Sequence, residues 1–474
     1  MVSNDFIIPS HWDCKPLVDC TSNKNISYGI VQPGQHDESG IGIIRVNNFE
    51  NGELNTSDVL KVTPSIESKF AKTRLSGGEV LLTLVGSTGQ SAVVPNELKG
   101  WNVARAVAVI KPSGEVTAEW LNICLQSSHT RNFLDARANT TVQKTLNLKD
   151  VKDIPIPLPP KDERDELERI AVNLNKKITL NRQINHTLEQ MAQSLFKSWF
   201  VDFDPVVDNA LDAGFFEQDL EFSDELLRRA EARKAVRECS DFKPLSNDIR
   251  QLFPAAFEEC VEPSVGINGW IPKGWFIAPL DNIANFQNGL ALQKFRPDSD
   301  EDEYLPVLKI AQLRQGYCDG NERARIDLKE SCRVYNGDMI FSWSGTLMTD
   351  IWTGGNAALN QHLYKVTSSK YPLSFYFHWT NHHLVRFQHI AAAKAVTMGH
   401  IKKGDLSDSF CVVPKNQTLA YFDSIAGAYL EQAKNVRLQC NTLVKLRDCL
   451  LPKLISGELC LENIEAKPTS ESVV

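Results

Sequence analysis

The sequence has few of the features that would assign the protein to a membrane, a metal site or a disulfide framework. No apolar run approaches the roughly 18 residues that a membrane-spanning helix needs, and the opening residues MVSND lack the basic and apolar segments of a signal peptide. The 11 cysteines form no CxxC pair, which argues against a zinc site, and their odd number argues against a disulfide set. We therefore expect a cytoplasmic protein with free thiols and no membrane contact.

The sequence also lacks the short motifs of the common nucleotide-binding and hydrolytic enzymes. It has no GxxxxGK[ST] phosphate loop, no GxGxxG turn, no GxSxG and no HExxH. Asp204-Pro205 is followed by valine, and not by the aromatic residue that amino-methyltransferases stack on a flipped base. His378, His382 and His383 have helical spacing, but no carboxylate or cysteine nearby completes a ligand set. These absences favour a binding protein, with no catalytic residue and no metal site.

The chain is acidic, with 51 Lys and Arg against 59 Asp and Glu, but the excess lies in one segment. Residues 161–267 carry 14 basic and 22 acidic side chains, a difference of -8 that equals the formal net charge of the whole chain. The longer stretches on either side are near neutral, so the net charge does not exclude nucleic acid as a ligand.

Among the features present, an internal duplication is the most informative. Ile8-Pro9 recurs as Ile271-Pro272 at an offset of 263, and further pairs follow in the same order at offsets that decrease from 264 to 255. These pairs are Ile44-Arg45-Val46 with Leu308-Lys309-Ile310, Gly78-Glu79-Val80 with Gly337-Asp338-Met339, and Asp150-Val151 with Asp405-Leu406. Two copies are too few for a solenoid, so the pattern predicts two similar globular domains, each followed by a similar helix.

Each copy has the pattern of a mixed α+β domain. Short apolar runs at 80–85, 103–110 and 339–343 predict buried strands, and those at 120–125 and 376–387 predict helices. At 474 residues the chain has room for two to four domains. We expect four segments: a domain at 1–155, a central region at 156–267, a second domain at 268–414 and a C-terminal region at 415–474.

Two long helices are predicted after the two domains, over residues 161–200 and 416–454. Prolines at 157, 159 and 160 precede the first helix, and acidic residues in its first turn suit the positive end of its dipole. Each helix carries one apolar stripe with spacings of three and four, so each needs a partner. We expect the two to pair antiparallel, although each could instead lie on its own domain. The expected pairing residues are Leu167, Ile170, Leu174, Ile184, Leu188, Met191, Leu195, Phe422, Ile425, Tyr429, Val436, Leu443, Leu446 and Leu450.

Residues 200–269 have no counterpart in the second copy. The acidic, arginine-containing run at 221–237 predicts a surface helix, which fits either a partner contact or a solvated insertion.

Two similar domains joined by antiparallel helices have an approximate two-fold axis, as duplex DNA has. If the ligand is DNA, such a molecule would place two domains on one face of the duplex, about one turn apart. Because the two copies differ in sequence, the target would be asymmetric, with an uncontacted spacer.

Several segments resemble the specificity subunits of Type I restriction–modification systems. Residues 194–206 (SLFKSWFVDFDPV) are similar to their central conserved segment, residues 156–160 (IPLPP) to the entry of the central helix, and residues 450–459 (LLPKLISGEL) to their C-terminal conserved end. Residues 341–347 (FSWSGTL), 358–363 (ALNQHL) and 397–401 (TMGHI) resemble segments of their target recognition domains. Glu163-Arg164 and the long acidic insertion depart from the pattern of many relatives.

The resemblance implies a non-catalytic subunit that recognises double-stranded DNA. It would join two methyltransferase subunits, which bring S-adenosylmethionine, to form an adenine-N6 methyltransferase. Two restriction subunits, with ATP and magnesium, would complete the nuclease. This chain would itself hold no cofactor. The long helices would set the distance between two target recognition domains and dock the methyltransferase subunits.

The residues that contact DNA are expected at equivalent positions of the two copies, since Arg, Lys, Asn and Gln recognise base edges while Ser and Thr hold phosphates. For each of them a role in supporting a loop is the alternative. The candidates are Arg45, Asn47, Ser87, Thr88, Arg105, Thr140, Thr141, Lys144, Lys309, Gln312, Ser344, Thr346, Asn360, Gln361, His362, Thr397 and Lys402.

Two other kinds of protein compete with this interpretation. A fused methyltransferase–specificity chain would need the adenosylmethionine and Asn/Asp-Pro-Pro-aromatic motifs that the sequence lacks. A coiled-coil scaffold would bind proteins and show no preference among DNA sequences.

Overall fold

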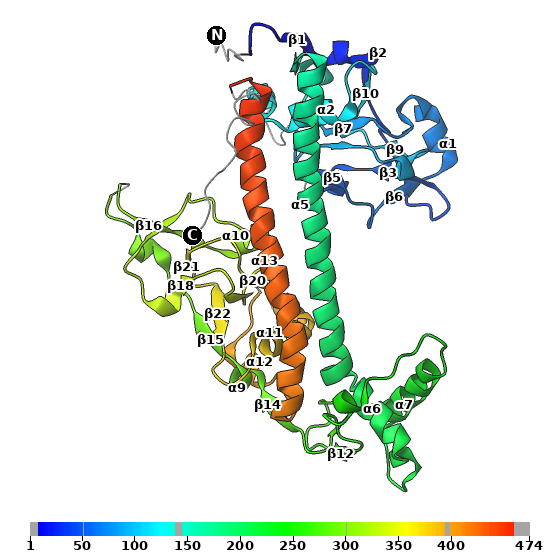
Figure 1. Cartoon of the computed structure of the whole chain (residues 1–474), viewed down its shortest axis with the longest axis vertical. Helices are drawn as coiled ribbons and strands as arrows, with labels where there is room; N and C mark the ends of the chain where they lie inside the picture. Colours follow the sequence, from blue (N-terminus) through cyan, green and yellow to red (C-terminus); the bar gives the residue numbers. More distant parts are fainter. Residues whose placement is uncertain (1–7, 51, 138–144, 300, 394–398, 459–474) are drawn as a thin grey trace, which may run out of the picture. The chain divides into compact units, whose positions relative to one another are not determined.

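The computed structural model describes residues 8–50, 52–137, 145–299, 301–393 and 399–458 (Figure 1). The chain folds as two units, one of residues 1–178 and 443–474 and one of residues 179–442. The boundary between the units passes through both long helices, so the expected division into four segments stays a prediction. Within the described ranges, no helix has the combination of length and apolar character that crossing a bilayer requires.

The first unit contains eleven strands and half of one long helix among its described residues. Its strands are β1 (Asp13–Pro16), β2 (Thr21–Tyr28), β3 (Ile41–Ile44), β4 (Phe49–Glu50), β5 (Glu53–Leu54), β6 (Leu60–Val62), β7 (Val80–Thr83), β8 (Ser91–Val93), β9 (Asn102–Val103), β10 (Val107–Pro112) and β11 (Pro155–Leu158). Its helices are α1 (Pro64–Glu67), α2 (Ala118–Gln126), α3 (Ser128–Asp135), α4 (Leu148–Lys152) and the first half of α5 (Lys161–Phe196). We call β1 to β11 with their helices the first domain.

The core of this unit joins the first domain to the ends of both long helices. Trp120 on α2 is fully buried and donates from its indole N–H to the Pro157 carbonyl at 2.9 Å. Thr117 caps α2 by accepting a hydrogen bond from the backbone N–H of Trp120, which fixes where the helix begins. The same cluster includes side chains from the start of α5 and the end of the C-terminal long helix, α13 (Asn416–Ile455), namely Leu167, Ala171, Leu451, Leu454 and Ile455.

The second unit repeats these elements and adds a helical module. Its strands are β12 (Phe257–Glu259), β13 (Trp270–Pro272), β14 (Phe276–Pro279), β15 (Asn285–Asn288), β16 (Tyr304–Leu308), β17 (Arg323–Arg325), β18 (Arg333–Val334), β19 (Met339–Ser342), β20 (Met348–Ile351), β21 (Ala357–Leu359), β22 (Leu363–Thr367) and β23 (Phe410–Val413). Its helices are α6 (Asp204–Asp212), α7 (Asp224–Arg237), α8 (Asn247–Arg250), α9 (Leu280–Ile283), α10 (Ile310–Gln315), α11 (Leu373–Ala393), α12 (Lys403–Ser407) and most of α13 (Asn416–Ile455). We call β14 to β23 with their helices the second domain.

Strand topology confirms the internal duplication. The main sheet of the first domain has the order β2-β10-β7-β8, and that of the second has the order β15-β22-β19-β20. In both domains the first strand pairs antiparallel with the last, β1 with β11 and β14 with β23. Both domains also contain one parallel strand pair, β3 with β9 and β16 with β21. Each domain therefore mixes helices and strands in the same connectivity, which confirms the expected α+β fold.

Both long helices form at the residues where the apolar stripes predicted them. α5 has 36 residues and continues into a π-helical turn at Lys197–Val201, and α13 has 40 residues. In the first unit the start of α5 packs on the end of α13. In the second unit the end of α5 packs on the start of α13. Within each unit the two helices are therefore antiparallel.

One predicted strand is wrong. The apolar run at 103–110 predicts one continuous strand, but it forms two strands, β9 and β10, in different sheets. The chain leaves the first sheet at Ala104, which pairs in parallel with Ile30, and the backbone N–H of Arg105 donates to the Ile30 carbonyl at 2.8 Å. A partner 75 residues away decides the break, so the local pattern could not show it.

Candidate nucleic-acid interface

In each domain a buried hydroxyl at the end of a central strand of the main sheet donates to a carbonyl of the loop that follows. In the first domain the buried Thr83 hydroxyl donates to the Ser87 carbonyl at 2.6 Å. In the second, the buried Ser342 hydroxyl donates to the Ser344 carbonyl at 3.1 Å. Glycine enters each loop with a positive φ, 77° at Gly86 and 65° at Gly345, which L side chains rarely adopt. The candidates Ser87, Thr88, Ser344 and Thr346 therefore lie on two equivalent, internally braced turns.

The turn of the second domain gathers aromatic and polar side chains from four parts of the chain. The ring of Trp343 lies 6.0 Å from that of His362 and 6.3 Å from that of His400. Its indole N–H donates to Asn288 Oδ1 at 3.2 Å, and His362 Nδ1 lies 3.0 Å from the Ser344 hydroxyl. We call Asn288, Trp343, Ser344, His362 and His400 the aromatic–imidazole cluster. Such side chains can stack on planar groups and exchange hydrogen bonds with base edges or phosphates.

The first domain has different chemistry at the equivalent positions. Strand register and bridges match Asn288 with Tyr28, Trp343 with Leu84, His362 with Ala106 and His400 with Thr145. Of these residues Tyr28 is exposed, whereas Leu84 is buried in the core. The two domains therefore present unlike surfaces on one backbone framework.

Arg45 and Lys309 occupy equivalent places, each as the residue before a short helix, and each has an acidic partner. Arg45 precedes the 3-10 turn Val46–Asn48, and its guanidinium lies 3.5 Å from Asp58. Lys309 precedes α10 and pairs with Glu322. Both carboxylates follow their partners by 13 residues. The same surface ion pair therefore recurs at equivalent places in the two domains.

Other candidates differ in accessibility. Asn47, Arg105 and Lys402 are exposed, and Gln361 and Gln312 are partly buried. Thr346 is exposed and accepts a hydrogen bond from Arg314 at 3.0 Å. The buried Asn360 accepts from the backbone N–H of His362 at 3.2 Å, so its side chain supports the loop and is not available to a ligand. Thr140, Thr141, Lys144 and Thr397 lie outside the described residues.

Sequence reasoning did not select Trp343, His400, Asn288 or Tyr28 as site residues. Two of the four lie in segments 341–347 and 397–401, which carry part of the family resemblance. The sequence offsets of 263 and 264 on either side of residue 28 would not have matched Tyr28 with Asn288, and only strand pairing gives the offset of 260 that also relates Ile30 to Leu290.

The contact surface between α5 and α13, which we call the seam, is narrower than the apolar stripes of the two helices predicted. Its buried residues on α5 follow spacings close to a heptad, so that only one line of side chains meets the partner. They are Leu167, Ala171, Ile178, Asn181, Leu188, Ala192 and Phe196. Of the expected pairing residues Leu167, Leu188 and Phe422 are buried, and Ile170, Leu174, Ile184, Leu195, Ile425, Tyr429, Val436, Leu443 and Leu450 are partly buried. Met191 and Leu446, each 44% exposed, lie off the seam and do not match the expectation.

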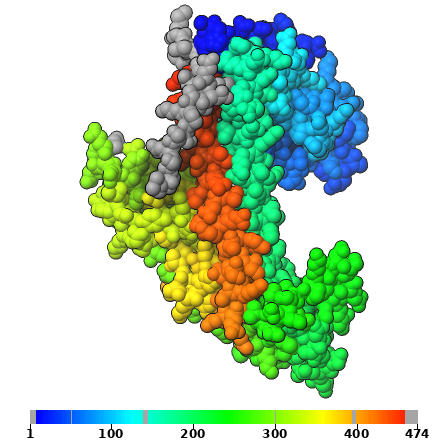
Figure 2. All heavy atoms as spheres, in the orientation of Figure 1, coloured from blue at the N-terminus to red at the C-terminus, as the bar shows by residue number. Residues whose placement is uncertain are grey.

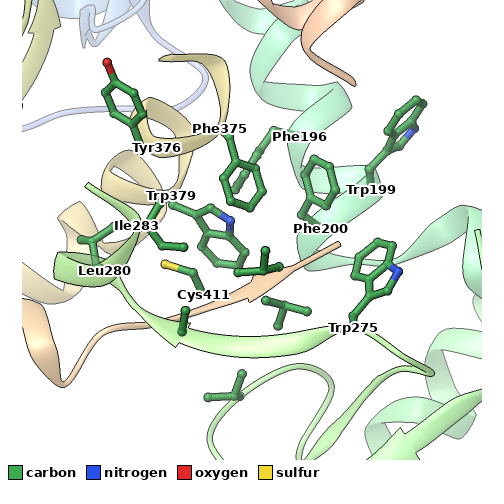
Figure 3. Close-up of a cluster of buried hydrophobic side chains, with 14 of the residues drawn as sticks. Phe196, Trp199, Phe200, Trp275, Leu280, Ile283, Phe375, Tyr376, Trp379 and Cys411 are labelled. Carbon is green, nitrogen blue, oxygen red and sulfur yellow. The ribbon is translucent and has the colours of Figure 1, made fainter. Parts of the chain in front are cut away.

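Residues 194–206 form the aromatic core where α5 ends (Figure 3). Phe200 packs edge-on against Phe422 at 4.8 Å and against Phe375 at 5.4 Å between ring centroids. Phe203 is fully buried with a φ of 53°, and Pro205 follows it in the first turn of α6. The turn from α5 into α6 is thus locked by side chains from α11 and α13 as well.

The acidic segment forms a module of helices α6, α7 and α8, which is a lobe beside the start of α13 in Figure 2. Five of its acidic residues, Asp202, Asp208, Asp212, Glu225 and Glu231, form ion pairs with its own basic side chains. Arg229 donates to Asp202 at 2.6 Å, and Arg233 donates twice to Asp208, at 2.9 and 2.8 Å. The expected surface helix at 221–237 is confirmed as α7, and the ion pairs of the module leave its acidic excess in place.

The three histidines of α11 do not form a metal site. His378 stacks on Phe196 at 5.3 Å, and burial lowers the pKa of its imidazole to about 4. Burial and the neighbouring His382 lower the pKa of His383 to about 3. Among the described residues, no group of three potential ligands is arranged to hold a metal ion. His378 is therefore a neutral core side chain, whereas His383 is partly buried and His382 is exposed.

Comparison with known proteins gives a consistent result. Residues 33–190 match the family described as Type I restriction modification DNA specificity domain. The chain is 24% identical over 400 residues to the Type I restriction enzyme MjaIX specificity subunit of Methanocaldococcus jannaschii, an alignment that covers 82% of this chain and 79% of that one. It is 24% identical over 411 residues to the HindI specificity subunit of Haemophilus influenzae, covering 82% and 88%. A shorter match, 30% identical over 188 residues, covers 39% of this chain and 40% of the EcoBI specificity subunit of Escherichia coli.

Proposed function

This chain is a relative of the Type I restriction enzyme specificity subunits, and from that premise we propose that it recognises an asymmetric bipartite DNA sequence for a Type I restriction–modification enzyme. Each domain recognises one half of the target, and the spacer between the halves stays uncontacted. The chain itself is not catalytic.

The observation that supports this proposal is that the two domains share one strand connectivity but carry different side chains at corresponding surface positions. The main sheets have one connectivity, yet Trp343 and His362 of the second domain correspond to Leu84 and Ala106 of the first. Base sequence is recognised by side-chain chemistry on a fixed backbone, so two unlike surfaces select two unlike half-sites. A protein scaffold without a DNA preference would not need a repeated fold with divergent loops.

The helices α5 and α13 supply the spacing and the docking surface. A continuous helix of 36 residues extends about 54 Å at 1.5 Å per residue. A rigid element of this length fixes the separation of two half-sites, and the exposed faces of the helix pair are free for two methyltransferase subunits. Those subunits bring S-adenosylmethionine and methylate adenine at N6. Two restriction subunits, with ATP and magnesium, complete a cytoplasmic nuclease.

A base-resolution map of N6-methyladenine tests the proposal. Cells would express this chain together with the methyltransferase subunit encoded beside it, and control cells would lack this chain only. We expect methylation of one bipartite asymmetric sequence that depends on the chain. Methylation that is unchanged by the chain, in the presence of a folded methyltransferase, would contradict the proposal. Binding of the methyltransferase without any DNA preference would instead identify a scaffold protein.

A further inference from the structure

We infer that Arg105 and Gln361 occupy equivalent base-contacting positions in the two domains. Arg105 selects guanine in one half-site, and Gln361 selects adenine in the other. This inference rests on the proposed function. It assigns one position, and a base to each copy of it, within the larger set of candidates.

The two residues have the same backbone environment. Each directly follows a parallel bridge, which joins Ala104 to Ile30 in the first domain and Asn360 to Leu290 in the second. The backbone N–H of Arg105 donates to the Ile30 carbonyl at 2.8 Å, and that of Gln361 donates to the Leu290 carbonyl at 2.9 Å. The two side chains therefore start from equivalent, hydrogen-bonded backbone.

A glycine permits this close approach in both domains. A Cβ at Gly29 would lie 1.8 Å from the Val103 carbonyl oxygen, and a Cβ at Gly289 would lie 2.3 Å from the Asn360 carbonyl oxygen. Both distances are far below van der Waals contact, so only glycine fits. The backbone before residues 105 and 361 is held against a neighbouring segment, and a side chain on such a support has a defined direction. Base recognition requires that kind of preorganisation.

The guanidinium of Arg105 differs from the side chains of Arg45 and Lys309 in having no acidic partner among the described residues. It is exposed, and within the part of the chain that the structure describes no acidic group pairs with it. Arg45 differs because it is paired with Asp58, as Lys309 is with Glu322. A free guanidinium offers two parallel N–H donors, which match the O6 and N7 acceptors of guanine in the major groove.

Gln361 is oriented by its neighbour. Its Nε2 lies 3.4 Å from His362 Nε2, and His362 Nδ1 lies 3.0 Å from the Ser344 hydroxyl. When His362 donates from Nδ1 to Ser344, its Nε2 accepts one amide proton of Gln361. The second amide N–H and the amide oxygen then remain, a donor and an acceptor on one plane. This pair matches the N7 acceptor and N6 donor of adenine.

Exchanging the two residues tests the inference. The full chain would be expressed with its methyltransferase subunit, and methylation would be measured on a pool of sites in which each base pair of the target is varied in turn. Arg105→Gln is expected to change one guanine of one half-site to adenine, and Gln361→Arg to change one adenine of the other half-site to guanine. Arg105→Ala and Gln361→Ala should lower discrimination at those same base pairs by roughly 5- to 150-fold, without creating a new preference.

Arg131→Gln is the matched control, because Arg131 is an exposed arginine on α3 of the first domain. It should leave every base preference unchanged. The half-site that is not targeted serves as an internal control for folding. Unchanged base preferences in both exchanged variants, or a uniform loss of methylation at all sites, would overturn the inference while leaving the proposed function intact. If the unaltered chain directs no bipartite methylation at all, both fail together.

Discussion

Arg437 on α13 donates two hydrogen bonds to Asp350 on β20, from Nη1 and Nη2 to the two carboxylate oxygens, each at 2.7 Å. Arg437 also lies 4.0 Å from Glu189 on α5. A single guanidinium therefore connects the main sheet of the second domain to both long helices within one unit. Planar, bidentate pairs of this kind fix orientation as well as distance.

We predict that Arg437→Met destabilises the protein by about 2–4 kcal/mol, because the partly buried Asp350 carboxylate loses its partner. Urea unfolding monitored by tryptophan fluorescence would measure the change. Glu431→Gln is the control, since the Glu431–Lys434 pair lies within one exposed turn of α13 and should contribute little. In the Arg437→Met background, Asp350→Asn should recover part of the loss. Equal effects of Arg437→Met and Glu431→Gln would contradict the prediction.

A second prediction concerns pH and the buried His378. Its folded-state pKa is about 4, below the ordinary value of 6.5, so the unfolded chain binds the proton more readily between these values. Folding stability should therefore fall as the pH drops from about 6.5 towards 4. For this residue alone the loss at pH 5 relative to pH 7.5 is about 2 kcal/mol.

Substitution of His378 by phenylalanine isolates this contribution. The ring would still stack against Phe196, and it would remove both the titration and a buried Nε2 that has no partner among the described residues. We expect a smaller difference between the free energies of unfolding at pH 7.5 and pH 5 in His378→Phe than in the unaltered chain. An identical pH dependence in both proteins would show that His378 does not titrate in this range.

The third prediction concerns the polar residue in the helix seam. Asn181 is buried, and its Nδ2 has no hydrogen-bond partner within the described residues. Asn181→Leu should therefore stabilise the protein, by about 1–3 kcal/mol, because it removes an unsatisfied buried group. Asn441→Leu is the matched control. Asn441 donates to the Thr353 carbonyl at 3.0 Å, so its replacement should destabilise. Changes of the same sign in thermal unfolding of the two variants would refute the distinction.

The fourth prediction compares two glycines of the second domain. Gly289→Ala would place a methyl group 2.3 Å from a backbone carbonyl oxygen, and should cost at least about 3 kcal/mol or prevent folding. Gly404 lies in α12, where a Cβ would meet nothing within 4 Å, so Gly404→Ala should be neutral or stabilising by up to about 1 kcal/mol. Circular dichroism during thermal unfolding would separate the two. A tolerated Gly289→Ala would mean that the bridge at Leu290 is not closely packed.

Much of the fold could be predicted from sequence because the chain contains an internal duplication, so its two halves can be compared with each other. The offset of 263 between Ile8 and Ile271 recurs between β1 and β14, and the offset of 255 between Asp150 and Asp405 recurs between β11 and β23. Periodicity located both long helices, because an apolar stripe with spacings of three and four over so many turns is typical of a helix that packs on another helix. These signals are either local or repeated, and both kinds are visible in a single sequence.

The features that could not be predicted depend on contacts between distant residues. The break at Arg105 is caused by Ile30, and the exclusion of Met191 from the seam depends on where α13 lies. The ion pairs of Arg45 with Asp58 and of Lys309 with Glu322 were not predicted, because each joins residues 13 positions apart. Trp343 was overlooked because it was assigned to the predicted buried strand at 339–343, whereas β19 ends at Ser342.

The first unit is built from two segments that lie far apart in the sequence, and this affects how it folds during synthesis. Its core needs Leu451, Leu454 and Ile455, yet these residues leave the ribosome after the whole second unit. At 5–20 residues per second, the interval between Ile178 and Leu443 lasts about 15–50 s. Throughout that interval the nascent first unit exposes an apolar strip on α5, which only the end of the chain can cover. A ribosome that stalls before residue 443 therefore releases a product with an open core, which is a substrate for chaperones and proteases.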